Sequence, residues 1–447
     1  MSLFISSNIT DDGRDTYFDV TTEGDITTMS LKAAADGQTI ETVLGAKNNY
    51  INLRAKEVFE GNGYTLIVED TELANPGTLG LFEINLDIFS YDDAPTIQNL
   101  NLTGSHTNDE AGYFLRSGSS FFNITNCFVL EGSISGSQSG GICGASAGSN
   151  GRCSIINCGT DCIINGSDAG GICGSGAGGG GRCDILNCYS TGNIAGDFSG
   201  GIVGNSAGQN TGVCNIIYCY SEGTIGGLSS GGICGVSAGT GFGDCYVLNC
   251  FSLAEVTGNK SGGIMAPIAN SNMIGDVMLF NCFADGATIL STGFGGLVGL
   301  GDGITNKITI VNCYSAQKTG NTSADTLEMP DSLNSALITT TNAIDGSSEA
   351  FTRQVFNDFV TTLESIDGSD DNYLAVFDII PGQGNAFTSK LDEIYPLVVD
   401  DSGIIEEEKA SDTVNIINNF VNGFNNKIIR GVSLIHIDAR ECYEELN

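Results

Sequence analysis

The residues that most often carry enzyme chemistry are unevenly represented in this sequence. It holds sixteen cysteines but only two histidines, His106 and His436, which lie far apart in the chain. A serine or cysteine nucleophile needs a base beside it, and no such pairing is visible here. We therefore predict a structural role for both histidines and assign no catalytic residue.

Fifteen of the sixteen cysteines lie between residues 127 and 313. The sequence contains no Cys-x-x-Cys pair, and two histidines cannot complete a set of zinc sites, so no metal site is expected. A free cysteine packs as a small apolar side chain. We predict reduced thiols in buried ladders, while disulfides between stacked cysteines remain an open alternative.

Enzymes that cleave polysaccharides need carboxylates gathered on one face. Asp168 and Asp197 fall near the same turn of neighbouring repeats, as do Glu222 and Glu255. No single repeat holds two acids poised together. This pattern disfavours cleavage of glycosides or uronates.

Two further patterns could bind anions. Arg152 and Arg182 precede Cys153 and Cys183 in neighbouring repeats, so two guanidiniums could meet one anion, although we expect them to fan into solvent. The glycine-rich loops at 176–181 and 239–243 lack the Gly-Lys-Ser/Thr ending of a phosphate loop and read as variable turns. No cofactor is predicted.

The elements that position these residues follow from a repeat. An Asn-Cys dipeptide or its near equivalent recurs at intervals of 30 to 32 residues, and Gly-Gly pairs keep the same step. Two markers in phase over six units indicate a true repeat. The marker cysteines are Cys127, Cys158, Cys188, Cys219, Cys250, Cys282 and Cys313.

Each repeat contains short β-branched runs bounded by Gly and Asn, which are typical of strands. A unit this short buries its apolar face only by stacking on its neighbours. We predict an all-β, right-handed parallel β-helix, a solenoid with coils of about 31 residues. An apolar ladder should run through the core, with a second ladder formed by the asparagine amides. The apolar ladder comprises Ile142, Ile172, Ile202, Ile233, Ile264 and Leu297.

The same residues carry a resemblance. Gly-Gly-Ile-Val-Gly at 200–204, Gly-Gly-Leu-Val-Gly at 295–299 and Asn-Cys-Tyr-Ser-Thr-Gly at 187–192 resemble the GLUG repeat. The resemblance covers about 127–315 and departs where Cys replaces Val, at Cys143, Cys173 and Cys234. It implies a β-helix without catalytic residues, as in bacterial surface proteins and in similar glycine- and cysteine-rich repeat proteins of large DNA viruses.

We divide the chain into four parts. Residues 1–63 are expected to cap the solenoid, and 64–322 to form it, with regular repeats from about 127. Residues 323–403 are expected to form a mixed α/β capping region, with an amphipathic helix over 350–366. Residues 404–447, which include three consecutive glutamates at 406–408, are predicted to form an acidic arm.

Charge is concentrated outside the repeats. The chain has a net charge of −36 from 53 acidic and 17 basic residues. Of these, 11 acidic and 5 basic residues lie within 127–320, which leaves a net charge of −30 in the flanks. This balance disfavours nucleic-acid binding. It favours either simple solubility or docking onto a basic partner.

The start of the sequence lacks the pattern of a secretory signal, and no run is long and apolar enough for a membrane helix. We therefore expect a non-enzymatic structural protein. Its expected place is a virion of a large DNA virus, made in the host cytoplasm, as a minor capsid or surface component that contacts other such proteins. Homo-oligomerisation stays open.

The alternative is a surface adhesin or glycan-binding module at a cell surface. Such a module would present aromatic rings along one wall. Aromatic residues do follow the ladder cysteines, and we expect them to be part of the core or partly buried rather than an exposed stripe. They are Phe128, Tyr189, Tyr220, Phe251, Phe283 and Tyr314.

Overall fold

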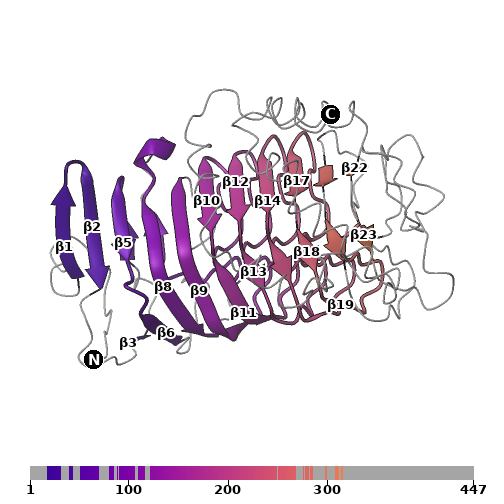
Figure 1. Ribbon diagram of the computed structural model, residues 1–447, viewed down its shortest axis with the longest axis horizontal. Coiled ribbons are helices and arrows are strands. Elements are labelled where there is room, and N and C mark those ends of the chain that lie inside the picture. The colour runs from indigo at the N-terminus through magenta and orange to yellow at the C-terminus, as the bar shows by residue number, and fades with distance from the viewer. Residues whose placement is uncertain are drawn as a thin grey trace, which may run out of the picture.

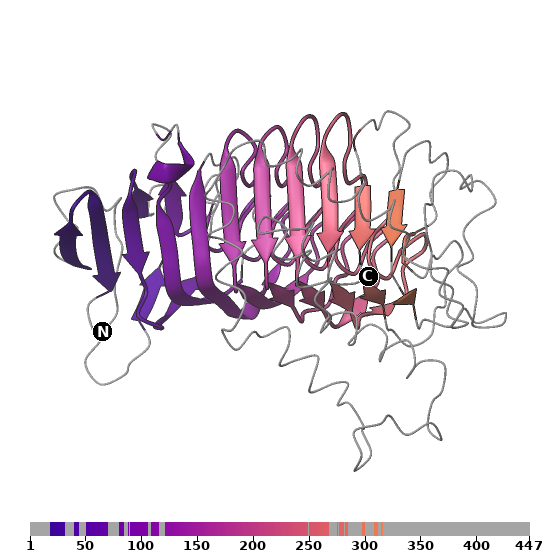
Figure 2. The same ribbon diagram turned by 45° about the horizontal axis from the view of Figure 1, so that its top comes forward.

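The computed structural model describes residues 18–31, 40–43, 51–69, 80–84, 88, 90–105, 109–115, 121–248, 250–267, 275, 277–280, 282–284, 297–299, 308–311 and 314–315. The described chain is a parallel β-solenoid whose regular turns are spaced about 31 residues apart, as the repeat predicts. Figures 1 and 2 show its strands stacked side by side along the long axis. The predicted helix over 350–366, the rest of the capping region and the acidic arm lie outside the described residues.

The first column of strands forms one wall of the solenoid, and its neighbours pair in parallel. Its members are β2 (Ile26–Leu31), β5 (Glu57–Glu60), β8 (Thr96–Gly104), β9 (Phe122–Ile134), β10 (Arg152–Ile156), β12 (Arg182–Leu186), β14 (Val213–Ile217), β17 (Asp244–Leu248), β20 (Val277–Phe280) and β22 (Ile308–Val311).

The second column forms another wall, to which the C-terminal parts of β8 and β9 contribute. Its other members are β3 (Ile40–Val43), β6 (Thr65–Glu69), β11 (Gly159–Ile164), β13 (Tyr189–Ser190), β15 (Tyr220–Ser221), β18 (Phe251–Ser252), β21 (Phe283–Ala284) and β23 (Tyr314–Ser315). A short ladder beyond it joins β16 (Thr224–Ile225) to β19 (Glu255–Val256).

The third column starts with β4 (Ile51–Leu53) and β7 (Phe82–Ile84) and continues as isolated parallel bridges. The predicted apolar ladder lies in this column. Its six members are fully buried, and successive isoleucines are joined by backbone hydrogen bonds, such as Ile142 N–H to the Ile172 carbonyl at 3.0 Å. The ladder is confirmed.

Parallel stacking begins earlier than the predicted start near residue 64, because β2 and β5 already pair in the first column. The described segment that breaks the parallel pattern is β1 (Phe18–Glu23), which pairs antiparallel with β2. This hairpin lies at the N-terminal end of the stack in Figure 1. The exposed side chains of β1 include Asp19 and Glu23, and charged residues on an edge strand disfavour edge-to-edge association.

Asparagines turn the chain from the first column into the second. Asn126, Asn157 and Asn187 have left-handed φ values of 53°, 53° and 52°, a conformation that asparagine tolerates better than most residues. Their amides form this part of the predicted ladder: Asn187 Nδ2 donates to Asn157 Oδ1 at 3.0 Å, and Asn157 Nδ2 donates to Asn126 Oδ1. The other predicted members, Asn249, Asn281 and Asn312, lie outside the described residues. The ladder continues through Asn99 to the carboxylate of Glu60.

The Gly-Gly pairs are required by crowding. A Cβ on Gly200 would lie 2.1 Å from the carbonyl oxygen of Val203 and 2.5 Å from the amide nitrogen of Gly235 in the next coil. The serine before such a pair is also buried. Ser230 Oγ accepts from the Ser199 amide at 3.3 Å and donates to the Gly196 carbonyl at 3.1 Å. These contacts fix one coil on the next.

Candidate functional site

The main charged cluster of the described chain is built on the outer side of the first column. Arg152 begins β10, and Arg182 begins β12 in the next coil. Both converge on Asp184: Arg152 Nε lies 3.2 Å from Asp184 Oδ2, and Arg182 Nε lies 3.0 Å from Asp184 Oδ1. The side chains are 6%, 13% and 1% exposed, respectively. The expectation that the two guanidiniums fan into solvent is therefore wrong.

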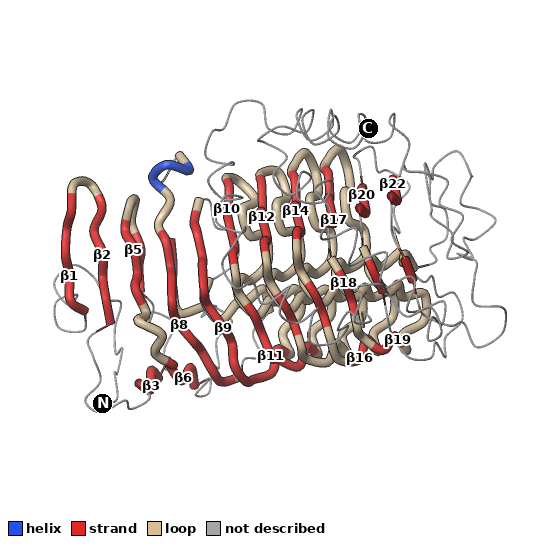
Figure 3. The backbone as a smooth tube through the Cα atoms, viewed as in Figure 1, coloured by secondary structure: helices blue, strands red, loops and turns tan. Residues whose placement is uncertain are grey.

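Neighbouring coils extend this cluster. Asn215 on β14, the register partner of Asp184, donates from Nδ2 to Asp184 Oδ1 at 2.7 Å. At the other end, the Tyr91 ring lies 4.3 Å from the Arg152 guanidinium carbon. The Tyr91 hydroxyl lies 2.7 Å from both Asn123 Oδ1 and Ser154 Oγ. Tyr91 belongs to the 3₁₀-helix η3 (Tyr91–Asp93), which Figure 3 shows beside β8.

This arrangement can hold charge but is poorly suited to proton transfer. Asp184 accepts hydrogen bonds from two guanidiniums and one amide, so both carboxylate oxygens are already occupied by partners within the cluster. Burial raises the pKa of Tyr91, which moves its titration further from neutrality. The cluster ties β9, β10, β12 and β14 together. The sequence signal for it was Arg182 and Asp184, because alternate residues of a strand point to the same side.

The structure does not bring the carboxylate pairs into register. Asp168 accepts from Asn205 Nδ2 at 2.7 Å, whereas Asp197 accepts from the Leu228 amide at 2.8 Å. Glu255 is aligned with Thr224 rather than with Glu222. The carboxylates of Asp168 and Asp197 thus bind different partners.

The fourteen described cysteines are all free and buried. The marker cysteines, which follow an asparagine except at Tyr218-Cys219, are held by the backbone. The Cys188 thiol donates to the Leu186 carbonyl at 3.3 Å and accepts from the Cys158 amide at 3.4 Å, and Cys219 repeats both contacts one coil later. Burial raises the pKa of Cys127 to about 12 and that of Cys162 to about 11, so these thiols stay protonated at neutral pH.

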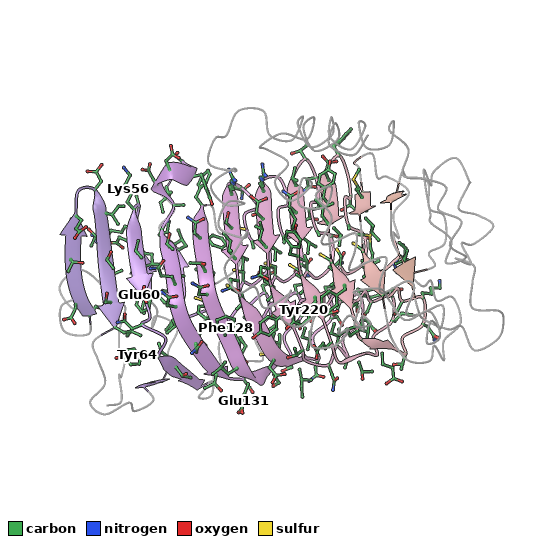
Figure 4. All side chains as sticks on the ribbon, in the orientation of Figure 1. Lys56, Glu60, Tyr64, Phe128, Glu131 and Tyr220 are labelled. Carbon is green, nitrogen blue, oxygen red and sulfur yellow. The ribbon has the colours of Figure 1, made fainter. Side chains whose placement is uncertain are left out.

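The aromatic column that follows the ladder cysteines is a stack of rings. The centroids of Tyr189 and Tyr220 are 5.3 Å apart, and those of Tyr220 and Phe251 are 5.1 Å apart, with the rings nearly parallel. Tyr220 and Phe251 are buried, whereas Phe128 and Tyr189 are partly buried. Figure 4 labels Phe128 and Tyr220 on this wall. The expectation of partial burial is met for these four residues.

Gly159 occupies the aromatic position between Phe128 and Tyr189. A Cβ there would meet the Tyr189 ring at 2.2 Å. The glycine lets Tyr189 lean across a coil until its centroid lies 6.1 Å from that of Phe128. Because the rings lie against one another, neighbouring rings cover much of each ring face.

Within the described ranges, no group of three or more His, Cys, Asp and Glu side chains could hold a metal ion. Both histidines, His106 and His436, lie outside those ranges. The described part of the chain also holds no helix long and apolar enough to cross a membrane.

Comparisons with known proteins do not assign the chain to a family. No protein-family model and no curated protein match the sequence, so the resemblance to the GLUG repeat is not shown by them. A crystal structure of a candidate immunoglobulin A1 protease from Bacteroides ovatus aligns with 65% of this chain and 75% of its own, at 20% identity and a TM-score of 0.32. A likeness at this level says nothing about the activity of the present chain.

Proposed function

We propose that the protein is a non-enzymatic structural component, a rigid solenoid of GLUG-type repeats that mediates contacts between proteins. The observation that carries this proposal is how each coil is bonded to the next. Amides, hydroxyls, thiols and the Arg152–Asp184–Arg182 cluster all link neighbouring coils. Because these side chains bond one coil to the next, they make the solenoid stiffer.

The preferred setting is the particle of a large DNA virus, as a minor capsid or surface component. The state of the cysteines supports a protein that folds in a reducing compartment, such as the host cytoplasm. Fourteen buried cysteines are free, and several adjoin one another. Disulfides form and persist in oxidising compartments, so a protein folded there would be expected to use some of these pairs.

A partner is expected at the acidic flanks. The wall between residues 127 and 320 is nearly neutral, whereas the flanks carry a net charge of −30. Complementary charge steers association and selects partners. The chemistry points to a basic surface on another capsid or surface protein.

Quantitative mass spectrometry of purified particles tests the setting. We expect the chain to co-purify with the particles at a constant ratio to the major capsid protein through successive density gradients. Loss of the chain during purification would contradict a capsid role.

A glycan-binding module is the second candidate, and the ring stack is the observation that favours it. Phe128 and Tyr189 remain partly exposed at its N-terminal end. A glycan array probed with the full chain distinguishes the two roles. Binding that is lost in Tyr189→Ala would support the glycan-binding role.

A further inference from the structure

The first column of strands is buried on both of its sides. Alternate residues of β12 and β14 point inward and belong to the hydrophobic core, namely Cys183, Ile185, Cys214 and Ile216. The residues between them point outward, because side chains alternate along a strand. These outward side chains are buried as well, although they are not members of the core cluster. The apolar ones, which we call the outer face, are Ile156, Leu186, Ile217, Tyr246, Leu248 and Met278, and they are 0–8% exposed.

Strand pairing alone does not bury side chains of this kind. Neighbouring strands flank an outward side chain at about 4.8 Å on either side but leave its end open. Tyr246 is nevertheless among the largest fully buried side chains of the described residues, at 1% exposed. A further layer must therefore lie on the outer face. Because this burial is that of a single chain, the layer belongs to the same chain.

The described segments that adjoin the outer face lie at its edges. Tyr91 of η3 contacts Ser154 on β10, and β17 lies three strands further along the column. The turn before β14 adjoins the first residue of that strand, since a Cβ on Gly178 would lie 2.2 Å from the Val213 carbonyl oxygen. Ile217 ends the same strand, about 13 Å further on. These segments therefore leave the centre of the outer face to another part of the chain.

The outer face has the dimensions of a helix. It extends over β10, β12, β14, β17 and β20, five strands that span about 19 Å at a spacing of 4.8 Å. The amphipathic helix predicted over 350–366 would be about 25 Å long. Its apolar stripe advances by about 6 Å from one residue to the next, so successive residues meet successive strands. The stripe comprises Phe351, Val355, Phe359, Leu363 and Ile366.

The chain is long enough to place this segment there. The last described strand, β23, ends at Ser315 and lies at the C-terminal end of the stack in Figure 1. Residues 316–349 follow before the predicted helix begins. At about 3.3 Å per residue, such a linker exceeds the length of the outer face several times over even when it is only partly extended.

We propose that residues 350–366 form a helix docked lengthwise on the outer face, with the apolar stripe against Leu186, Ile217 and Leu248. The helix covers the side of the solenoid rather than its end. The first wall is then occupied by the chain itself, which leaves the second wall and the flanks for a partner. The inference does not rest on the proposed function, because it concerns contacts within one chain.

Two methionines report on the proposed contact. Met278 points outward on β20, where it is the register partner of Tyr246, whereas Met265 lies in the core at 0% exposed. The full chain is treated with dilute hydrogen peroxide, and the sulfoxide at each methionine is followed by mass spectrometry. In each event the peroxide transfers one oxygen atom to the thioether sulfur and leaves as water. We expect both methionines of the wild type to oxidise slowly.

A pair of variants tests the helix. Phe359→Asp places a charge within the apolar stripe, whereas Asn357→Asp adds the same charge on the opposite side of the predicted helix. We expect Phe359→Asp to raise the oxidation rate of Met278 roughly tenfold or more, because the docked state loses a buried phenylalanine. Asn357→Asp should leave that rate unchanged, and Met265 should stay slow in both variants. If Met265 also accelerates in Phe359→Asp, the coils have opened, and the milder Phe359→Ala decides by the same comparison.

Four results would overturn the proposal. Rapid oxidation of Met278 in the wild type would show that the outer face is open. Equal Met278 rates in the wild type, Phe359→Asp and Phe359→Ala would show that residues 350–366 do not cover it. Exposure of Met278 only when residues 404–447 are deleted would assign the cover to that segment. A Met278 rate that falls as protein concentration rises would assign it to a second copy of the chain.

Discussion

At the scale of single residues, this solenoid uses asparagine for two tasks at once. Asn157 supplies the left-handed turn between two walls and a link in a chain of amides that ends on Glu60. Asn187 Oδ1 is a buried acceptor without a hydrogen bond, and the next coil has Tyr218 at that position, which offers no side-chain amide. The ladder therefore ends where the repeat departs from its consensus.

Replacing Asn157 should separate the two tasks. Asn157→Ala loses the amide links and places alanine at positive φ, at a cost of about 1 kcal/mol for the backbone and about 1 kcal/mol for each lost hydrogen bond. Asn157→Gly accepts the backbone conformation and loses only the links. Urea unfolding of both variants should rank wild type above Gly and Gly above Ala. Equal stability of all three proteins would show that the asparagine amide ladder does not stabilise the fold.

The buried thiols make stability sensitive to alkaline pH. The folded pKa of Cys127 is about 12, above its ordinary value of 9.0, and burial likewise raises the pKa values of Tyr91 and Tyr113. The unfolded state then loses protons first, so the free energy of unfolding falls as pH rises above about 9. Urea melts at pH 8, 9.5 and 10.5 should show a progressive loss. Cys127→Ala should lessen the slope, and an unchanged slope would contradict this assignment.

At the scale of elements, the two glycines of each pair are fixed by neighbouring backbone. Gly200→Ala forces a methyl group against the Val203 carbonyl and the Gly235 amide. We expect a loss of roughly 3 kcal/mol or more, at the upper end of what overpacking costs.

Gly226→Ala is the matched control in the next coil. Its added methyl group would lie 3.7 Å from Thr257 Oγ1 and 3.8 Å from the Ile194 carbonyl, which are ordinary contacts. Its stability should stay within about 1 kcal/mol of wild type. Thermal melts of the two variants side by side test whether crowding, rather than glycine as such, is what the repeat requires.

Sequence periodicity predicted those elements whose contacts repeat in every coil. The isoleucine ladder, the asparagine amides at Asn126, Asn157 and Asn187 and the partly buried rings are where the 31-residue step places them. The Arg152 environment was predicted wrongly, because Asp184 in the next coil draws both guanidiniums against the wall. The Tyr91 contact could not be predicted from the repeat, since Tyr91 comes from outside it. The start of the stack was set too late, since β2 and β5 show strand pairing without the glycine and cysteine markers.

At the scale of the whole molecule, the protein combines a solenoid with a nearly neutral wall and flanking segments whose sequence is acidic. The coils bury an apolar and thiol-rich core and link to one another through side chains as well as backbone. Such a rod offers its walls and ends to partners. The alternative roles of the protein therefore differ in which part of the rod, wall or end, would bind its partner or ligand.

The most direct measurement is particle incorporation of a chain that lacks residues 404–447, compared with the full chain over a range of salt concentrations. We predict that the truncated protein keeps the β-rich circular dichroism spectrum of the solenoid but enters particles less efficiently. Incorporation of the full chain should weaken as salt rises, because exposed charges are screened beyond about 8 Å at physiological ionic strength. Normal, salt-independent incorporation of the truncated chain would contradict a structural role that acts through the acidic flank.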